Sequence, residues 1–97
     1  NVRKNLVDKK VRVLLGDLTK LPSKLFDVIV ANIDFPTIIQ SLPDLYHRLK
    51  DEGIIILSGL LLSDQSRLVV ELDRHSLIPL EILSENEWLA LSVGRSE

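Results

Sequence analysis

The stretch FDVIVANI, Phe26 to Ile33, decides the class of fold. Residues 26–31 form a nearly continuous apolar run with β-branched side chains, which is typical of a strand covered on both faces of a parallel sheet. The run ends in a small residue and an amide, Ala31 and Asn32. An amide at the end of a buried strand needs hydrogen-bond partners, so Asn32 has either a structural role, such as capping the next segment, or a ligand-binding role.

The segments before and after this strand alternate between the spacing of apolar residues typical of strands and that typical of helices. Residues 1–10 are polar and are predicted to be the tail of a helix, and residues 11–15 are predicted to form a strand that ends at Gly16. Residues 36–50 carry apolar side chains at helical spacing. Pro43 predicts a kink or a restart in that helix, with Ser41 and Asp44 as a capping box.

The second half of the chain predicts one more strand and helix, followed by a hairpin. Residues 53–58 are again an apolar run, and Ser63 is a suitable cap for a helix that ends near His75 and Ser76. Residues 77–83 and 88–93 flank a polar turn at 84–87, which predicts two antiparallel strands. Trp88 is expected to pack this hairpin onto a helix. The chain therefore predicts an α/β fold with a mostly parallel sheet and a terminal antiparallel hairpin.

Composition excludes several classes of function. The 97 residues are 45% hydrophobic and 27% charged with a net charge of −2, which is typical of one globular domain and offers no basic face for nucleic acid or anionic membranes. The chain contains no Cys, which excludes disulfides, thiolate catalysis and zinc ribbons, and we expect a cytoplasmic protein without a metal site. Since it contains no Met, we also expect it to be a piece of a longer chain.

Polar or small residues follow three of the predicted strands, at Gly16–Asp17, at Asn32 and at Ser58–Gly59. Ligands bind beyond the carboxyl ends of parallel strands, so these positions are expected to share one rim of the sheet. Each has a simpler alternative: Gly16–Asp17 as a turn, Asp34 as a helix cap, and Ser58–Gly59 as space for a neighbouring helix. The two histidines, at 47 and 75, have no carboxylate or second histidine at ligand spacing, so neither predicts a metal site.

Three segments together resemble a known family. They are GDLTKLPSKLFDVIVANI at 16–33, DEGIIILSGLL at 51–61 and NEWLALSVGR at 86–95. In this order they resemble the carboxyl-terminal half of class I S-adenosylmethionine-dependent methyltransferases, and most closely the ribosomal-protein methyltransferases of the PrmA type. The resemblance runs from about residue 5 to residue 95. It implies a Rossmann-like sheet and an enzyme that methylates amino groups of the eleventh protein of the large ribosomal subunit.

The resemblance also implies a role for each strand end. Asp17 and Leu18 match positions beside the adenine ring of S-adenosylmethionine, and Asn32 matches an amide that lies against the cofactor near the methyl-transfer site. Asn32 is therefore the expected catalytic residue as well as a cofactor contact. An amide carbonyl orients a neutral amine through its N–H without carrying charge.

Two positions depart from the family pattern. Asp34 stands where the family usually has a small or apolar residue, and His75–Ser76 stands where a small residue and Gly commonly close the helix. In the family, the Gly-rich cofactor loop and the ribose-binding acid come from the first two strands, which would precede residue 1. Residues 1–97 are thus expected to be a partial methyltransferase domain that binds S-adenosylmethionine weakly or not at all and is inactive alone.

The missing strands also affect residues 11–15, because in the family this strand pairs with one of them. We expect it to dock on the edge of residues 26–31, to pair with another copy of the chain through an exposed edge, or to be disordered. The leading hypothesis is a fragment of a protein N-methyltransferase. The alternatives are a methyltransferase for another protein or a small molecule, and a non-catalytic α/β association module.

Overall fold

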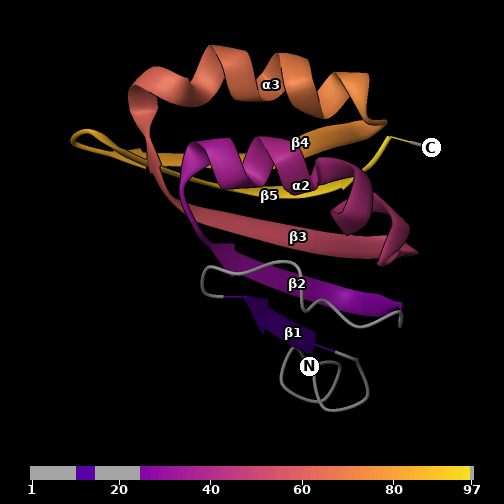
Figure 1. Ribbon diagram of the computed structural model, residues 1–97. Helices are drawn as coiled ribbons and strands as arrows, with labels where there is room; N and C mark the ends of the chain where they lie inside the picture. The colour runs from indigo at the N-terminus through magenta and orange to yellow at the C-terminus, as the bar shows by residue number, and fades with distance from the viewer. Residues whose placement is uncertain (1–10, 15–24, 97) are drawn as a thin grey trace.

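The computed structural model describes residues 11–14 and 25–96, which form a five-stranded sheet with two helices on one of its faces (Figure 1). The elements are β1 (Val11–Leu14), β2 (Phe26–Asn32), α2 (Phe35–His47), β3 (Leu49–Leu61), the 3-10 helix η2 (Leu62–Asp64), α3 (Gln65–Arg74), β4 (Leu77–Glu85) and β5 (Trp88–Arg95). The strands and helices expected from periodicity are present across the described residues. The helix expected at the start of the chain lies outside them.

The sheet is mixed, with the strand order β1-β2-β3-β5-β4. The pairs β1–β2 and β2–β3 are parallel, whereas β3–β5 and β4–β5 are antiparallel. The prediction of a mostly parallel sheet is therefore not confirmed, although the terminal antiparallel hairpin is. The hairpin joins the sheet through its second strand, so it adds two antiparallel pairings to the two parallel ones.

Strand β1 pairs in parallel with the edge of β2, in the register Val11↔Val28 to Leu14↔Ala31. Of the three placements expected for this strand, docking on the edge of residues 26–31 is the one found in the structure. The backbone of β2 is consequently paired on both sides, since β3 lies along its other edge.

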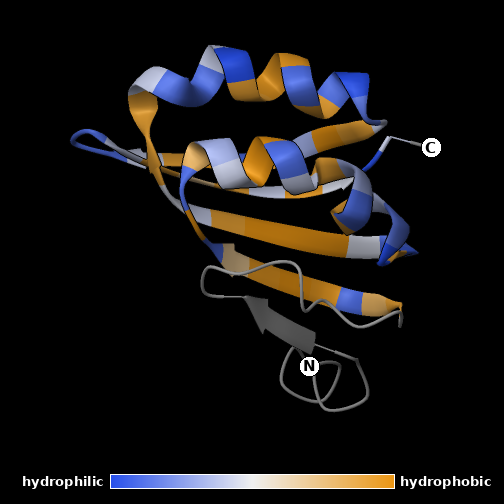
Figure 2. Ribbon diagram, viewed as in Figure 1, coloured by the Kyte–Doolittle hydropathy of each residue, from blue (hydrophilic) through white to orange (hydrophobic). Residues whose placement is uncertain are grey.

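The hydrophobic core lies between the sheet and the two helices. Figure 2 shows apolar residues along β2 and β3, and alternate residues of these strands face the helices. Side chains that are at most 1% exposed include Ile29, Ala31, Ile38, Leu42, Leu45, Ile55, Leu57, Leu68 and Leu72. Burying each of the larger aliphatic side chains contributes about 1.5–3 kcal/mol, so this single layer holds both helices on the sheet.

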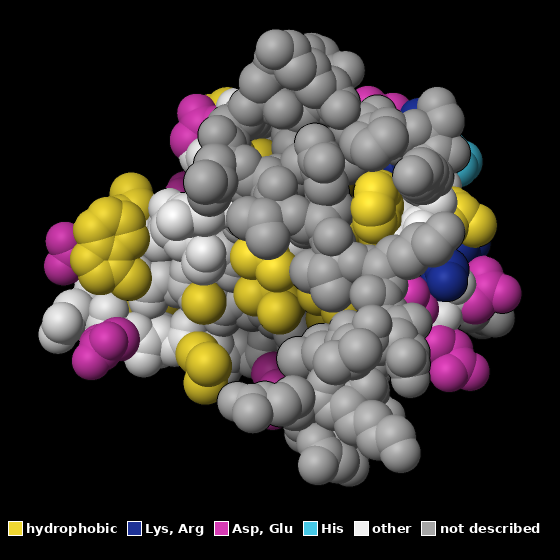
Figure 3. All heavy atoms as spheres, turned by 90° about the horizontal axis from the view of Figure 1, so that it is seen from below, with side chains coloured by type: hydrophobic (Ala, Val, Ile, Leu, Met, Phe, Trp, Pro, Cys, Tyr) yellow, Lys and Arg dark blue, Asp and Glu magenta, His cyan; other side chains and the backbone are white. Residues whose placement is uncertain are grey.

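The opposite face of the sheet is more open than the sequence predicts. Ile54 and Ile56 on β3 are 36% and 39% exposed, and Val28 and Val30 on β2 are only partly buried. Figure 3 shows hydrophobic side chains in the middle of this face. The prediction that both strands are covered on two faces is wrong for β3 in the described part of the chain, because α2 and α3 lie on the same side.

Helix α2 runs through Pro43 without a second start. The Ser41 hydroxyl donates to the Thr37 carbonyl oxygen at 2.7 Å, so the predicted capping box between Ser41 and Asp44 does not form. Buried Leu42 and Leu45 flank the proline and hold this turn against the sheet, which compensates for the one backbone hydrogen bond that proline removes. The helix ends at His47, earlier than predicted, because β3 begins at Leu49.

Helix α3 ends in a conformation that usually requires glycine. Ser76 has a φ of 61°, and its N–H donates to the Asp73 carbonyl oxygen at 3.2 Å. The left-handed region is the common end of an α-helix and is normally occupied by Gly. Ser76 thus adopts a backbone conformation that glycine, the residue common here in the family that the sequence resembles, takes up without strain.

Arg95, in the last strand, links that strand by hydrogen bonds to the connection between α2 and β3, which is called the α2–β3 corner below. Its guanidinium donates to the Leu49 carbonyl oxygen at 3.0 Å and to the Tyr46 hydroxyl at 2.8 Å, and it lies 4.2 Å from the centroid of the Tyr46 ring. An ion pair with Asp51 at 3.2 Å adds little, because the Asp51 side chain is 91% exposed. This corner lies at the amino end of β3.

Candidate functional site

Asn32 is the last residue of β2 and is exposed. It pairs in register with Ser58 on β3, which is the last pairing between the two parallel strands. Strand β3 does not end there as the sequence predicted but continues to Leu61 along β5. The residue before it and the residue after it, Ala31 and Ile33, are both buried. The structure therefore anchors the backbone on either side of Asn32 while its carboxamide remains accessible.

Gly59 makes room for the side chain of Asn32. Its φ of +77° lies in the left-handed region, and a Cβ atom built there would stand 3.4 Å from Asn32 Cγ and would overlap Asn32 Oδ1. The pairing of β3 with β5 shifts register between Leu57 and Leu60, so Gly59 lies within an irregularity of the ladder. The space that we expected to serve a neighbouring helix is instead occupied by the carboxamide.

A groove extends from this point along the β4–β5 hairpin. Its volume is about 560 Å³, and its lining includes Ser58, Gly59, Leu83, Glu85, Trp88 and Ala90. The hairpin projects beyond the sheet on the side where β2 and β3 end, as Figure 1 shows. Asn32 therefore lies against the glycine at the inner end of the groove, and the hairpin supplies its outer wall.

Trp88 lies in this groove and not against a helix. Its side chain is 52% exposed, whereas its neighbour Leu89 is 2% exposed and belongs to the core. Successive side chains of a strand point to opposite faces, so a buried Leu89 directs Trp88 away from the helices. The prediction that Trp88 packs the hairpin onto a helix is therefore wrong, although the alternation in WLALSV contained the signal that places it.

The other residues expected at the site have different outcomes. Asp17 and Leu18 lie outside the described residues. Asp34 is exposed two positions beyond Asn32 and occupies the N-cap position of α2, but its side chain makes no capping hydrogen bond. Its carboxylate is therefore available at the same rim.

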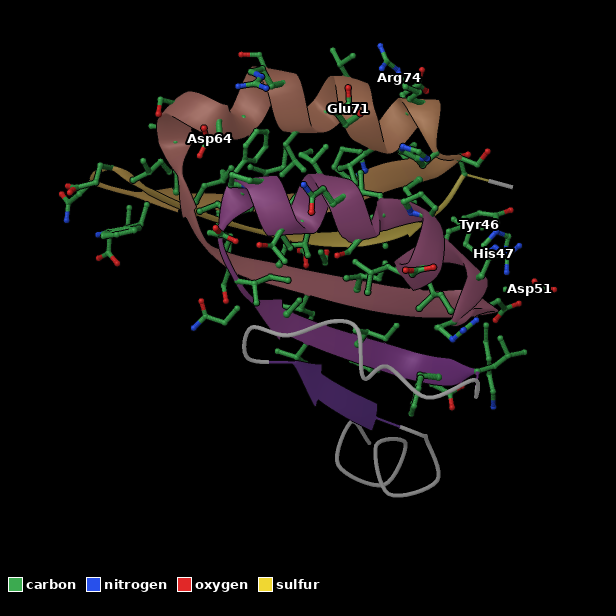
Figure 4. All side chains as sticks on the ribbon, in the orientation of Figure 1. Tyr46, His47, Asp51, Asp64, Glu71 and Arg74 are labelled. Atoms are coloured by element: carbon green, nitrogen blue, oxygen red, sulfur yellow. The ribbon has the colours of Figure 1, made fainter. Side chains whose placement is uncertain are left out.

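The histidines lie away from this rim. His47 ends α2 and makes an edge-on contact with Tyr46, with 5.5 Å between ring centroids. Figure 4 shows Tyr46, His47 and Asp51 at one end of the sheet and Asp64 at the opposite end, where β3 leads into η2. Within residues 25–96, no group of three or more His, Cys, Asp or Glu side chains is placed to hold a metal ion. None of the helices in that part of the chain has the length and apolarity to cross a bilayer.

Comparison with protein families relates residues 1–96 to the family described as ribosomal protein L11 methyltransferase (PrmA). A protein of that name from Desulfotalea psychrophila is 35% identical over 92 residues, which cover 94% of this chain and 30% of the relative. Another from Heliobacterium modesticaldum is 33% identical over 96 residues, covering 99% of this chain and 30% of the relative. The chain thus spans about 30% of the length of these curated relatives.

Comparison with solved structures also finds a ribosomal protein L11 methylase. The crystal structure of a ribosomal protein L11 methylase from Lactobacillus delbrueckii subsp. bulgaricus superimposes with a TM-score of 0.75 at 26% identity, covering 82% of this chain and 41% of that one. A mitomycin 7-O-methyltransferase superimposes with a TM-score of 0.63 at 12% identity, covering 82% of this chain and 32% of the other, which shows a shared fold alone. The expected fold and family resemblance are both supported by these matches.

Proposed function

Because the chain belongs to the ribosomal protein L11 methyltransferase (PrmA) family, we propose that it forms the acceptor side of the catalytic domain of a protein N-methyltransferase. The full-length protein transfers a methyl group from S-adenosylmethionine to amino groups of ribosomal protein L11. The relatives that carry this name are about three times as long as the matched segment, since the match covers 30% of their length. The activity is accordingly proposed for the full-length protein.

The observation that carries the proposal is the position of Asn32. Its carboxamide is exposed at the carboxyl end of β2, beside Ser58 and over the open backbone of Gly59. In open parallel sheets this rim is where ligands bind. A flexible surface amide would serve poorly as an orienting group, but buried Ala31 and Ile33 hold this one in place.

The chemistry requires orientation more than covalent assistance. S-adenosylmethionine supplies an electrophilic methyl group on a sulfonium. The lone pair of a neutral amine forms the new N–C bond as the S–C bond breaks, the electron pair of that bond goes to sulfur, and the resulting ammonium loses a proton to water. In this proposal the carboxamide oxygen of Asn32 accepts an N–H hydrogen bond from the amine, which directs the lone pair toward the methyl group.

The described residues fit one edge of such a site. Asn32 offers an amide oxygen and an amide N–H, and Gly59 has no side chain that would block approach from the groove. Asp34 contributes a second exposed polar group at the same rim. Adenine contacts from Asp17 and Leu18 are part of the proposal and rest on the family resemblance.

The proposal also covers the isolated chain and the location of the full-length protein in the cell. The 97-residue chain alone binds S-adenosylmethionine weakly or not at all and is inactive, and isothermal titration that gave micromolar affinity would contradict this. The full-length protein acts in the cytoplasm, and cell fractionation tests that location.

The decisive experiment is transfer of labelled methyl from S-adenosylmethionine to purified ribosomal protein L11 by the full-length protein, with mass spectrometry to locate the methyl groups. Asn32→Ala is expected to lower kcat on the order of 100-fold, because a misplaced acceptor loses near-attack geometry. Gln40→Ala removes a matched carboxamide from the exposed surface of α2 and is expected to leave kcat unchanged. Methyl groups found on oxygen, or an Asn32→Ala variant of normal activity, would refute the proposal.

A further inference from the structure

The backbone of Asp34 is fixed at the rim, two residues beyond Asn32. Its φ of −70° and ψ of 161° continue the extended backbone of β2, and the Ile38 N–H donates to its carbonyl oxygen at 3.0 Å. The side chain of Ile33, between the two, is 6% exposed, whereas Asn32 and Asp34 are both exposed. Alternate residues of an extended chain point to the same side, so the carboxamide and the carboxylate project from the rim together.

Helix α2 does not use this carboxylate. Asp34 occupies the N-cap position of the helix, but its side chain makes no capping hydrogen bond. The second residue of the helix is Pro36, which has no N–H, so one of the two donors available to an N-cap side chain is missing. Among the residues that the structure describes, no lysine, arginine or histidine forms an ion pair with Asp34. Helix capping, the simpler alternative, therefore does not account for the acid.

We infer that Asp34 is a catalytic residue of the proposed methyl transfer, whose carboxylate stabilises the positive charge that develops on the acceptor nitrogen. The inference rests on the proposed function and deepens it by assigning a second residue at the acceptor. It also gives a role to a position at which the sequence departs from the family that it resembles, since a small or apolar side chain there cannot supply a negative charge.

The movement of charge during the reaction explains why a carboxylate is useful at this position. As the new N–C bond forms and the S–C bond breaks, the electron pair of the S–C bond goes to sulfur, and the positive charge passes from sulfur to nitrogen. An anion nearer to the nitrogen than to the sulfur therefore interacts more strongly with the transition state than with the bound reactants. The ammonium product then loses its proton to water, and Asp34 forms no covalent bond.

The spacing of Asn32 and Asp34 allows both side chains to act on one nitrogen. In an extended chain, residues two apart have Cβ atoms roughly 6–7 Å apart. One nitrogen with hydrogen bonds of about 2.9 Å on either side bridges such a distance. The neutral carboxamide orients the amine, whereas the carboxylate acts through its charge. Removal of the charge alone should therefore slow transfer and leave the affinity for S-adenosylmethionine unchanged.

The test measures methyl transfer by the full-length protein to ribosomal protein L11, with the acceptor varied and S-adenosylmethionine saturating. Asp34→Asn keeps the shape of the side chain and a favoured N-cap residue, and it should lower kcat/KM for the acceptor about five- to twentyfold. Asp34→Glu restores the charge and should recover much of the loss. The KM for S-adenosylmethionine should change less than about twofold in both variants.

Asp44→Asn is the matched control, because Asp44 is an exposed acid near the other end of the same helix. It should leave every constant unchanged, and circular dichroism should show that each variant is folded. A value of kcat/KM for Asp34→Asn within about twofold of the wild type overturns the inference, even if Asn32→Ala abolishes transfer and the proposed function stands. A raised KM for S-adenosylmethionine with unchanged acceptor kinetics also overturns it, because Asp34 would then be a cofactor contact.

The binding of two cofactor analogues gives a readout that does not depend on turnover. In sinefungin, a carbon that carries an amino group replaces the methylated sulfur, so a cationic nitrogen takes the place of the transferred methyl group; S-adenosylhomocysteine has a neutral sulfur there. In isothermal titration of the full-length protein, Asp34→Asn should weaken sinefungin binding about three- to tenfold and S-adenosylhomocysteine binding less than about twofold. Equal effects on the two ligands would overturn the inference. Binding of neither ligand to the wild type would refute the proposed function and the inference with it.

Discussion

Gly59 is the position at which fold and function can be perturbed together. Two independent features make a side chain unfavourable there: the φ of +77° and the overlap of a new Cβ atom with Asn32 Oδ1. Gly59→Ala therefore strains the end of β3 and displaces the carboxamide from its place over the glycine. We predict lower stability and a loss of methyl transfer from the same substitution.

The magnitude follows from the two features. An alanine in the left-handed region costs about 1–2 kcal/mol. Forcing Asn32 off its rotamer costs on the order of 0.5–1.5 kcal/mol more. Gly59→Ala should thus destabilise the protein by about 1.5–3.5 kcal/mol, a large fraction of the stability of a small domain.

Gly94→Ala is the matched control on the neighbouring strand. A Cβ atom there would lie 3.2 Å from Leu80 Cδ1, and Leu80 is 53% exposed, so the far end of its side chain can move. We expect a change within about 0.5 kcal/mol in urea unfolding followed by circular dichroism. Methyl transfer by Gly94→Ala should equal that of the wild type, whereas Gly59→Ala should lower kcat about as much as Asn32→Ala does.

A double-mutant cycle tests whether Asn32 and Gly59 are in contact. If the Cβ atom introduced by Gly59→Ala collides with the carboxamide, Asn32→Ala should relieve that part of the strain, and the two substitutions should be non-additive by about 0.5–1.5 kcal/mol. Additivity within about 0.3 kcal/mol would refute the contact on which the site geometry depends. Equal stability of Gly59→Ala and Gly94→Ala would refute the backbone argument as well.

Two further predictions concern the ends of the last elements. Ser76→Gly should stabilise the protein by about 1 kcal/mol and raise Tm by roughly 5 °C, because glycine adopts a φ of 61° without penalty; a lower Tm would show that the serine side chain contributes more than its backbone costs. Arg95→Ala should destabilise by about 2–3 kcal/mol in urea unfolding, since it removes two charge-assisted hydrogen bonds, to Leu49 O and Tyr46 Oη. Asp51→Asn should change stability by less than about 0.5 kcal/mol because Asp51 is 91% exposed, and an equal effect of the two variants would disprove this ranking.

Local pattern was sufficient to predict most of the elements. Apolar runs predicted β2 and β3, helical spacing predicted α2 and α3, and a polar turn predicted the hairpin. The position of Asn32 beside Ser58 also follows from sequence, because the carboxyl ends of parallel strands point to the same edge of a sheet. These features depend on interactions between residues that are near in sequence or on the direction of whole strands.

Other features could not be predicted because they depend on which face of the sheet the helices cover. Alternation indicates that Trp88 and Leu89 point to opposite faces, but it does not say which face is buried; both helices lie on the side of Leu89, so Trp88 lines the groove. The exposure of Ile54 and Ile56 has the same cause. Helix propensity alone also failed at Pro43, where burial of Leu42 and Leu45 holds one continuous helix.

The sequence by itself determined the order and type of the elements, the parallel direction of the first strands and the amide at the end of β2. Only the tertiary structure decided that Gly59 receives the side chain of Asn32, that Arg95 fastens the last strand to Tyr46, and that the hairpin forms a wall of the groove. The physical reason is that periodicity indicates which side chains share one face of a helix or strand. Contacts between distant segments depend instead on which face of the sheet the helices cover.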